Sequence, residues 1–96
     1  MLDSASRKLL RKLAQSIEPL VQIGKHGLTE AALKNIDRAL GDHELIKVKF
    51  IEQKEEKREL SREIAEKTHS ELVDVIGNTA ILYRQNPEPA KRKLKL

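Results

Sequence analysis

Apolar residues recur at helical spacing through residues 4–17, so this segment is predicted to form the first helix. At about 100° per residue, one half of the helix carries Leu9, Leu10, Leu13, Ala14 and Ile17. Pro19 pushes Glu18 toward extended geometry, so the helix is expected to stop before it. Residues 20–23 then predict a short strand.

A second helix is predicted from Thr29 to about Leu40. Thr29 is a favourable N-cap, and Leu28 and Leu33 have the spacing of a hydrophobic staple. The predicted buried stripe of this helix comprises Ala32, Leu33, Ile36 and Leu40. Gly41 is expected to end the helix.

Residues 44–51 alternate between apolar and polar positions, which predicts a strand with one mainly buried face. The face expected to be buried carries Ile46, Val48 and Phe50. The opposite face carries Leu45, Lys47, Lys49 and Ile51. Residues 55–69 predict a third, almost wholly charged helix whose thin apolar stripe requires docking for stability.

The last two predicted strands are residues 72–76 and 80–84, joined by a tight turn. Gly77 and Asn78 are both expected to take positive φ in this turn, which is too short for anything but antiparallel pairing. Helices alternating with the earlier strands imply crossover connections. The order α-β-α-β-α-β-β therefore predicts an α/β (α+β) domain with a mixed four-stranded sheet and packed helices.

The chain has 96 residues, and we expect a single domain over residues 1–86 and a basic, disordered tail over residues 87–96. The absence of cysteine excludes disulfides and cysteine-based zinc sites. The three histidines are scattered, and no nucleophile elbow, P-loop or Rossmann fingerprint occurs. We therefore expect no catalytic residues, metal or cofactor. The lack of a long apolar run and of a signal peptide favours a cytoplasmic protein without a membrane partner.

Positive charge lies mainly outside one segment of the chain. The net charge is +4, but residues 51–71 contain seven acids and five bases, so the rest carries a net charge of +6. Such a distribution can present a basic face to a polyanion, and it can equally serve solubility. The predicted first helix carries four basic residues on one side, with no acidic residue among them: Arg7, Lys8, Arg11 and Lys12.

The loop Gly24–Lys25–His26–Gly27 is the sharpest local signal. Two glycines at the start of a helix let another backbone approach closely, and the helix dipole favours phosphate oxygens. KH domains clamp a nucleic-acid backbone with such a loop. A plain strand-to-helix turn would have the same pattern. Tyr83 could likewise stack on a base or belong to the core.

Three motifs in the same order resemble the CRM domain of the bacterial YhbY family. The first is the GxxG loop at 24–27 within the stretch LVQIGKHGLTEAALKNIDRALGDHELIKVKF, residues 20–50. The second is HELIKV at 43–48, and the third is the closing hairpin with VIG at 75–77 and ILYR at 81–84. The resemblance covers about residues 6–86.

The resemblance implies an RNA-binding protein whose fold is similar to the C-terminal domain of translation initiation factor 3. Stand-alone bacterial members associate with precursors of the large ribosomal subunit, and plant relatives carry the domain in organelle intron-splicing factors. It implies ribosome assembly as the function and rRNA of the large-subunit precursor as the partner. The interior of the loop and the third helix vary, and the basic tail is not part of the core motif, so no RNA sequence preference is transferred.

The expected RNA contacts are Gly24, Lys25, His26, Gly27, Arg7, Lys8, Arg11, Lys12, Lys34 and Arg84. The protein is expected to act as a monomer without a small-molecule substrate. The alternative is a protein-interaction module that reaches the ribosome through a ribosomal protein and uses the charged third helix. Weak salt dependence with naked rRNA would distinguish this alternative.

Overall fold

A computed structural model describes residues 2–94 and 96 of the chain; Met1, and Lys95 of the predicted tail, lie outside the described residues. The molecule measures 37 × 24 × 22 Å. Its elements are α1 (Ser4–Ala14), β1 (Val21–Ile23), α2 (Glu30–His43), β2 (Leu45–Phe50), α3 (Lys57–Lys67), β3 (Glu71–Ile76), β4 (Thr79–Tyr83) and the 3₁₀ turn η1 (Pro89–Lys91). The predicted order of helices and strands is confirmed.

The four strands form one mixed sheet in the order β1-β2-β4-β3. β1 pairs with β2 in parallel, and α2 makes the crossover between them. β2 and β3 both pair antiparallel with β4. The α+β fold class predicted from the sequence is therefore confirmed.

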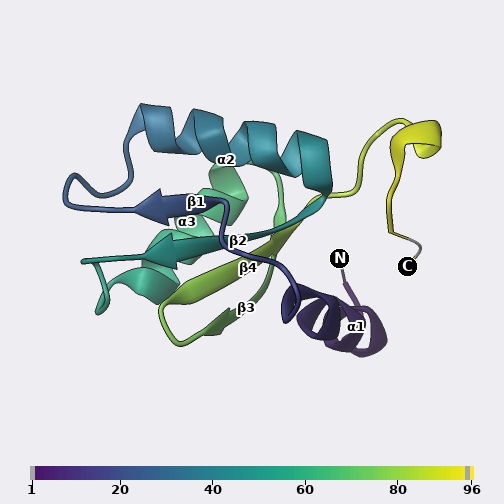
Figure 1. Ribbon diagram of the computed structural model, residues 1–96, viewed down its shortest axis with the longest axis horizontal. Helices are drawn as coiled ribbons and strands as arrows, with labels where there is room; N and C mark the ends of the chain where they lie inside the picture. Colours follow the sequence, from purple (N-terminus) through teal and green to yellow (C-terminus); the bar gives the residue numbers. More distant parts are fainter. Residues whose placement is uncertain (1, 95) are drawn as a thin grey trace.

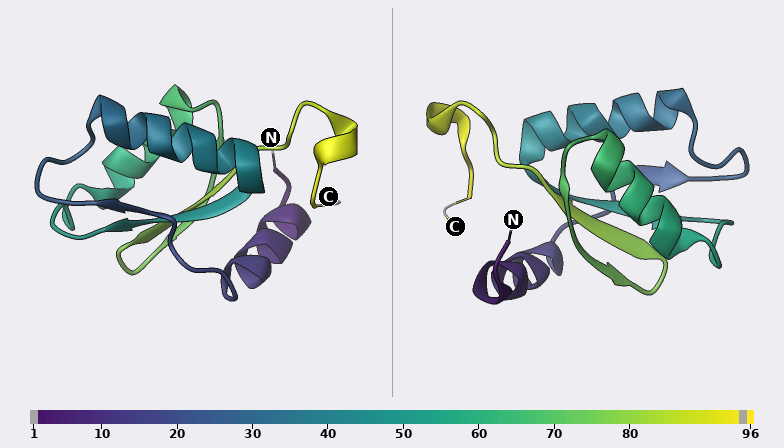
Figure 2. Two further views of the ribbon diagram at one scale, coloured as in Figure 1. Left: turned by 45° about the horizontal axis from the view of Figure 1, so that its top comes forward. Right: turned by 180° about the vertical axis from the view of Figure 1, so that it is seen from behind.

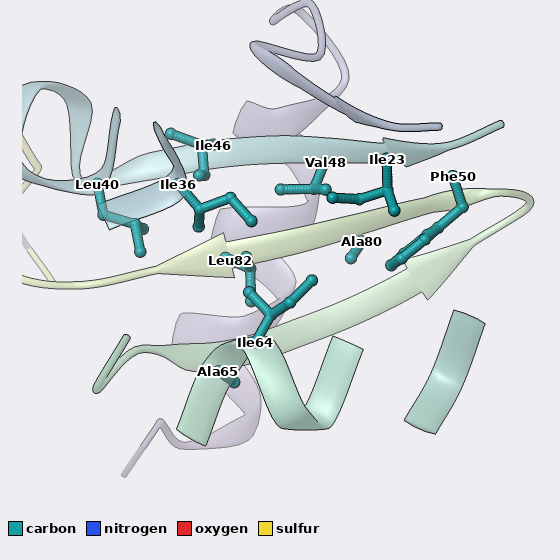
Figure 3. Packing of buried hydrophobic residues seen from close by; sticks show 10 residues of the cluster. All are labelled: Ile23, Ile36, Leu40, Ile46, Val48, Phe50, Ile64, Ala65, Ala80 and Leu82. Atoms are coloured by element: carbon teal, nitrogen blue, oxygen red, sulfur yellow. The ribbon is translucent and has the colours of Figure 1, made fainter. Parts of the chain in front are cut away.

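Helices cover both faces of the sheet (Figures 1 and 2). α2 and α3 lie on one face and enclose the larger core cluster (Figure 3), which contains Ile23, Ile36, Leu40, Ile46, Val48, Phe50, Ile64, Ala65, Ala80 and Leu82. α1 lies on the opposite face, where a second cluster contains Leu10, Ala14, Leu45, Val73, Ile81 and Tyr83. α1 covers only part of its face, and Lys49 and Ile76 on the rest of that sheet surface are exposed to solvent.

The second face of β2 differs from the prediction. Leu45 is buried because α1 packs on it, whereas Lys47 and Lys49 on the same face are half-buried and exposed. The sequence pattern gave β2 one mainly buried face, but a helix from before the strand covers part of the other. In the hairpin, Gly77 has a positive φ of 59°, and Asn78 does not. Glycine at the first central position alone is the requirement of a type II′ turn.

Two helix ends also differ from the prediction. α1 stops at Ala14, and the next three backbone N–H groups bond three residues back, which tightens the end of the helix. α2 passes through Gly41 to His43, and Glu44 takes the conformation that ends it, with φ 64° and ψ −48°. Non-glycine residues rarely adopt this region.

The carboxylate of Glu44 explains that conformation. Glu44 is 1% exposed, and its side chain accepts hydrogen bonds from the backbone N–H groups of Asn86, Lys93 and Leu94. Leu94 also packs against the cluster beneath α1. The described residues 87–94 thus fold back on the domain, although their basic composition predicted a disordered tail. The sequence did not indicate a buried acceptor for the backbone of this segment.

Candidate nucleic-acid interface

The GxxG loop forms a closed turn between β1 and α2. The N–H of Gly27 donates to the carbonyl oxygen of Gly24 over 3.0 Å, and Lys25 and His26 occupy the exposed tip. Gly27 has a φ of 69°, which favours glycine. Gly24 has no such constraint, and within the described part of the chain no atom beyond Gly24 and its two neighbours lies within 4 Å of the place where its Cβ would stand. The absence of a side chain at Gly24 therefore leaves room for an outside group.

A residue from another loop braces this turn. Nε2 of Gln53 donates to the carbonyl oxygen of Gly24 over 2.8 Å. Gln53 lies between β2 and α3, 29 residues from its partner. No sequence pattern marks Gln53, because a glutamine in a polar loop has no characteristic spacing.

The N-terminus of α2 faces a shallow hollow beside the loop. Oγ1 of Thr29 accepts from the N–H of Ala32 over 3.1 Å, which confirms the predicted N-cap. The hollow has a volume of about 270 Å³, and its lining includes all four loop residues and Asn35. Positive charge from Lys25 and the positive end of the helix dipole suits this hollow to a phosphate group.

The four basic residues of α1 do not share one environment. Lys8 and Lys12 are exposed and can therefore meet a polyanion. Nη1 of Arg7 donates to the carbonyl oxygens of Leu72 and Val73 over 2.7 and 3.1 Å. This contact fixes α1 to the bulged part of β3, so Arg7 has a structural role.

Arg11 is half-buried and borders a groove between α1 and the sheet, together with Lys47. The loop and α1 lie toward opposite ends of the long axis in every view (Figures 1 and 2). The loop and the basic residues of α1 therefore form two separate regions. The open part of the sheet, with Lys47 and Lys49, lies on the same face as α1.

Arg84, a predicted RNA contact, makes several hydrogen bonds within the protein. Its Nη1 donates to Oδ1 of Asp37 over 2.6 Å and to the carbonyl oxygen of Thr68 over 2.8 Å. Its Nη2 donates to the carbonyl oxygen of Asp37. The guanidinium thus ties α2 to the end of α3. Lys34, in contrast, is exposed on α2.

Tyr83 belongs to the core beneath α1 and cannot stack on a base. Burial raises the pKa of its hydroxyl group, and the nearby Glu44 carboxylate raises it further. Among residues 2–94 and 96, no three histidine, aspartate or glutamate side chains gather as a metal site. No helix within this part of the chain is long and apolar enough to span a membrane.

Comparison with known proteins identifies the family. The model of the CRS1/YhbY (CRM) domain matches residues 2–84. "Probable RNA-binding protein PA4753" of Pseudomonas aeruginosa is 37% identical, with 94% of this chain and 88% of that protein covered. "Probable RNA-binding protein YqeI" of Bacillus subtilis is 35% identical, with 92% and 93% covered.

The fold and a solved structure agree with this match. The solution structure of SAV1595 from Staphylococcus aureus, described as a hypothetical protein and candidate RNA-binding protein, has a TM-score of 0.83 and 41% identity. The alignment covers 99% of this chain and 100% of that one. The chain thus belongs to the CRS1/YhbY (CRM) domain family.

Proposed function

We propose that this protein binds RNA and acts as a non-enzymatic assembly factor on precursors of the large ribosomal subunit. The observation that carries the RNA-binding proposal is the exposed turn at residues 24–27, set at the N-terminus of α2 and braced by Gln53. Relatives along nearly the whole chain are named RNA-binding proteins. The assembly role rests on the resemblance to stand-alone bacterial YhbY proteins, and it implies action in the cytoplasm.

The turn is suited to the RNA backbone rather than to base edges. A phosphate can approach Gly24 without meeting a side chain, while Lys25 supplies charge and His26 can donate a hydrogen bond. Lys8 and Lys12 would contact phosphates at the other end of the molecule. Contacts of this kind release counterions, so the affinity for RNA should fall steeply as the salt concentration rises. We expect the protein to bind as a monomer.

Charge reversal in the turn tests RNA binding. In the variant Lys25→Glu/His26→Glu, affinity for a large-subunit rRNA fragment should fall by about 100-fold at low salt, because attraction becomes repulsion. Arg58 occupies an exposed position on α3, and Arg58→Glu makes the same charge change as Lys25→Glu; it should change affinity by about twofold or less. An unfolding curve confirms that each variant folds. Unchanged affinity of the double variant for the rRNA fragment would show that the turn is not part of the RNA interface.

Crosslinking in cells tests the assembly role. We expect crosslinks enriched at a few positions of large-subunit rRNA and lost when Lys25 and Arg11 are charge-reversed. Crosslinks spread over all cellular RNA would contradict a role in assembly. Ribosome association that resists salt and charge reversal would instead indicate recruitment through a ribosomal protein.

A further inference from the structure

The groove between α1 and the open part of the sheet has a volume of about 260 Å³. Its lining includes Arg11 and Ala14 from α1, Lys47 from β2, and Ile76, Thr79 and Ile81 from the hairpin strands. No aspartate or glutamate from the described part of the chain belongs to this lining. The groove therefore combines cations with apolar surface and places no carboxylate among them.

Strand register explains why these residues share one surface. Lys47 stands opposite Ile81 across β2 and β4, and Thr79 stands opposite Ile76 across β4 and β3. Residues directly opposite one another point to the same face of a sheet, as do residues two apart on one strand. Ile81 is buried under the edge of α1, whereas Ile76 is 55% exposed. The apolar floor of the groove thus extends from the buried Ile81 to the solvent-exposed Ile76.

A ligand that matches this groove needs a flat apolar part beside an anionic part. An unpaired nucleotide has both, because its base can lie on Ile76 while its phosphate meets Arg11 or Lys47. A base inside a duplex is stacked and paired, so it cannot reach the floor. The volume is slightly below the roughly 300–1,000 Å³ of sites for drug-sized molecules, which suits a single nucleotide.

We propose that this groove holds one unpaired nucleotide of the bound RNA. The proposal rests on the proposed RNA-binding function and narrows it to RNA with a single-stranded segment beside α1. Lys12 on the exposed side of α1 and Lys49 on the open sheet extend the positive surface away from the groove. The neighbouring phosphates of the same strand would lie along these lysines.

The test compares two RNA probes on the full chain, a single strand and a blunt duplex, each about 12 nucleotides long. Ile76→Thr keeps a β-branched residue but removes apolar floor, so affinity for the single strand should fall by about three- to fivefold. Lys47→Glu should lower it by about tenfold or more. The duplex should lose about twofold or less with Ile76→Thr. Matched controls are Ile51→Thr, an exposed isoleucine outside the groove, and Arg58→Glu.

The outcomes separate this proposal from the proposed function. If the wild-type chain binds both probes and Ile76→Thr weakens neither or both equally, the groove holds no base, while RNA binding stands. If the wild-type chain binds neither probe nor an rRNA fragment, the proposed function fails together with the groove. A polyglutamate peptide serves as a competitor for the groove. If the peptide displaces the single strand and Ile76→Thr weakens binding of the peptide as well, the groove binds an acidic peptide and the proposed nucleotide site is wrong.

Discussion

The side-chain amide of Gln53 donates to the carbonyl oxygen of Gly24, and so joins the loop before α3 to the turn before α2. The other amide atom of Gln53, Oε1, is buried and has no hydrogen-bond partner among residues 2–94 and 96. A buried oxygen without a partner costs free energy, which offsets part of the stabilisation from the bond to Gly24. Its geometry indicates that Gln53 positions the turn.

Replacing Gln53 with Met should loosen the turn without unfolding the protein. The bond to Gly24 is lost together with the unpaired oxygen, so the free energy of unfolding should change by only about 1 kcal/mol. Amide hydrogen exchange at Lys25 and His26 should accelerate, and RNA affinity should fall by about three- to tenfold. A loosened turn with unchanged RNA affinity would show that binding does not need its preorganised form.

Arg84→Gln should lower stability and leave RNA binding intact. Its guanidinium bonds to Asp37 and to the carbonyl oxygen of Thr68, so losing these contacts should cost about 1–2 kcal/mol of unfolding free energy. Urea denaturation measures the loss. RNA affinity measured on the folded fraction should change by about twofold or less. Weaker RNA binding at unchanged stability would show that Arg84 contacts RNA.

Glu44 should make folding sensitive to acid. Burial alone would raise the pKa of its carboxyl group, but three backbone N–H donors and the nearby Arg92 outweigh burial and lower the pKa below its ordinary value of 4.5. A carboxyl group with a lowered pKa stabilises the fold above that ordinary value, and its contribution is lost as the pH falls through the folded pKa. The free energy of unfolding should therefore drop below about pH 4.5.

Glu44→Gln isolates this contribution. The variant should lose about 1–3 kcal/mol at neutral pH and show a shallower acid dependence than the wild type. The pKa of Asp3 is also lowered, by hydrogen bonds from Ser6, and this contribution remains in both proteins. Parallel acid profiles for the two proteins would show that the carboxylate does not hold residues 86–94.

Lys8→Glu/Lys12→Glu should weaken RNA binding and its salt dependence together. Both side chains are exposed, and each lost phosphate contact should reduce the slope of log affinity against log salt by about 0.7–0.9. The unfolding free energy should stay near that of the wild type. Arg7→Gln provides the contrast, because loss of its bonds to β3 should lower stability instead. An unchanged salt slope in the lysine variant would exclude this face of α1.

The fold could be predicted because its periodic segments are strong. The stripe of α2, the alternation of β2 and the glycine turn of the hairpin each depend on neighbouring residues. The end of α2 was not predictable in this way. Helix propensity favours a stop at Gly41, but the groups that stabilise the turn at Glu44 come from residues 86–94.

The candidate site was likewise predictable only where it depends on residues close together in the sequence. The spacing of Gly24 and Gly27 before a capped helix is local, so the sequence alone indicated the turn. The structural use of Arg7 and Arg84 was not visible, because their acceptors lie up to 66 residues away. Composition shows how many cations a chain has. Only the fold shows which of them remain available to a ligand.

The separation of the turn from α1 sets a minimum size for any RNA that uses both. The long axis of the molecule is 37 Å, and the two regions lie toward its opposite ends. At the roughly 3.4 Å per nucleotide of a stacked helical strand, about eleven nucleotides cover the full 37 Å, so a stacked strand that reaches both regions needs at most about that number. Oligonucleotides too short to reach both regions would engage one end only and would lose the gain from joining two weak contacts. The molecule can thus discriminate RNAs by the length and path of an accessible segment, without reading its sequence.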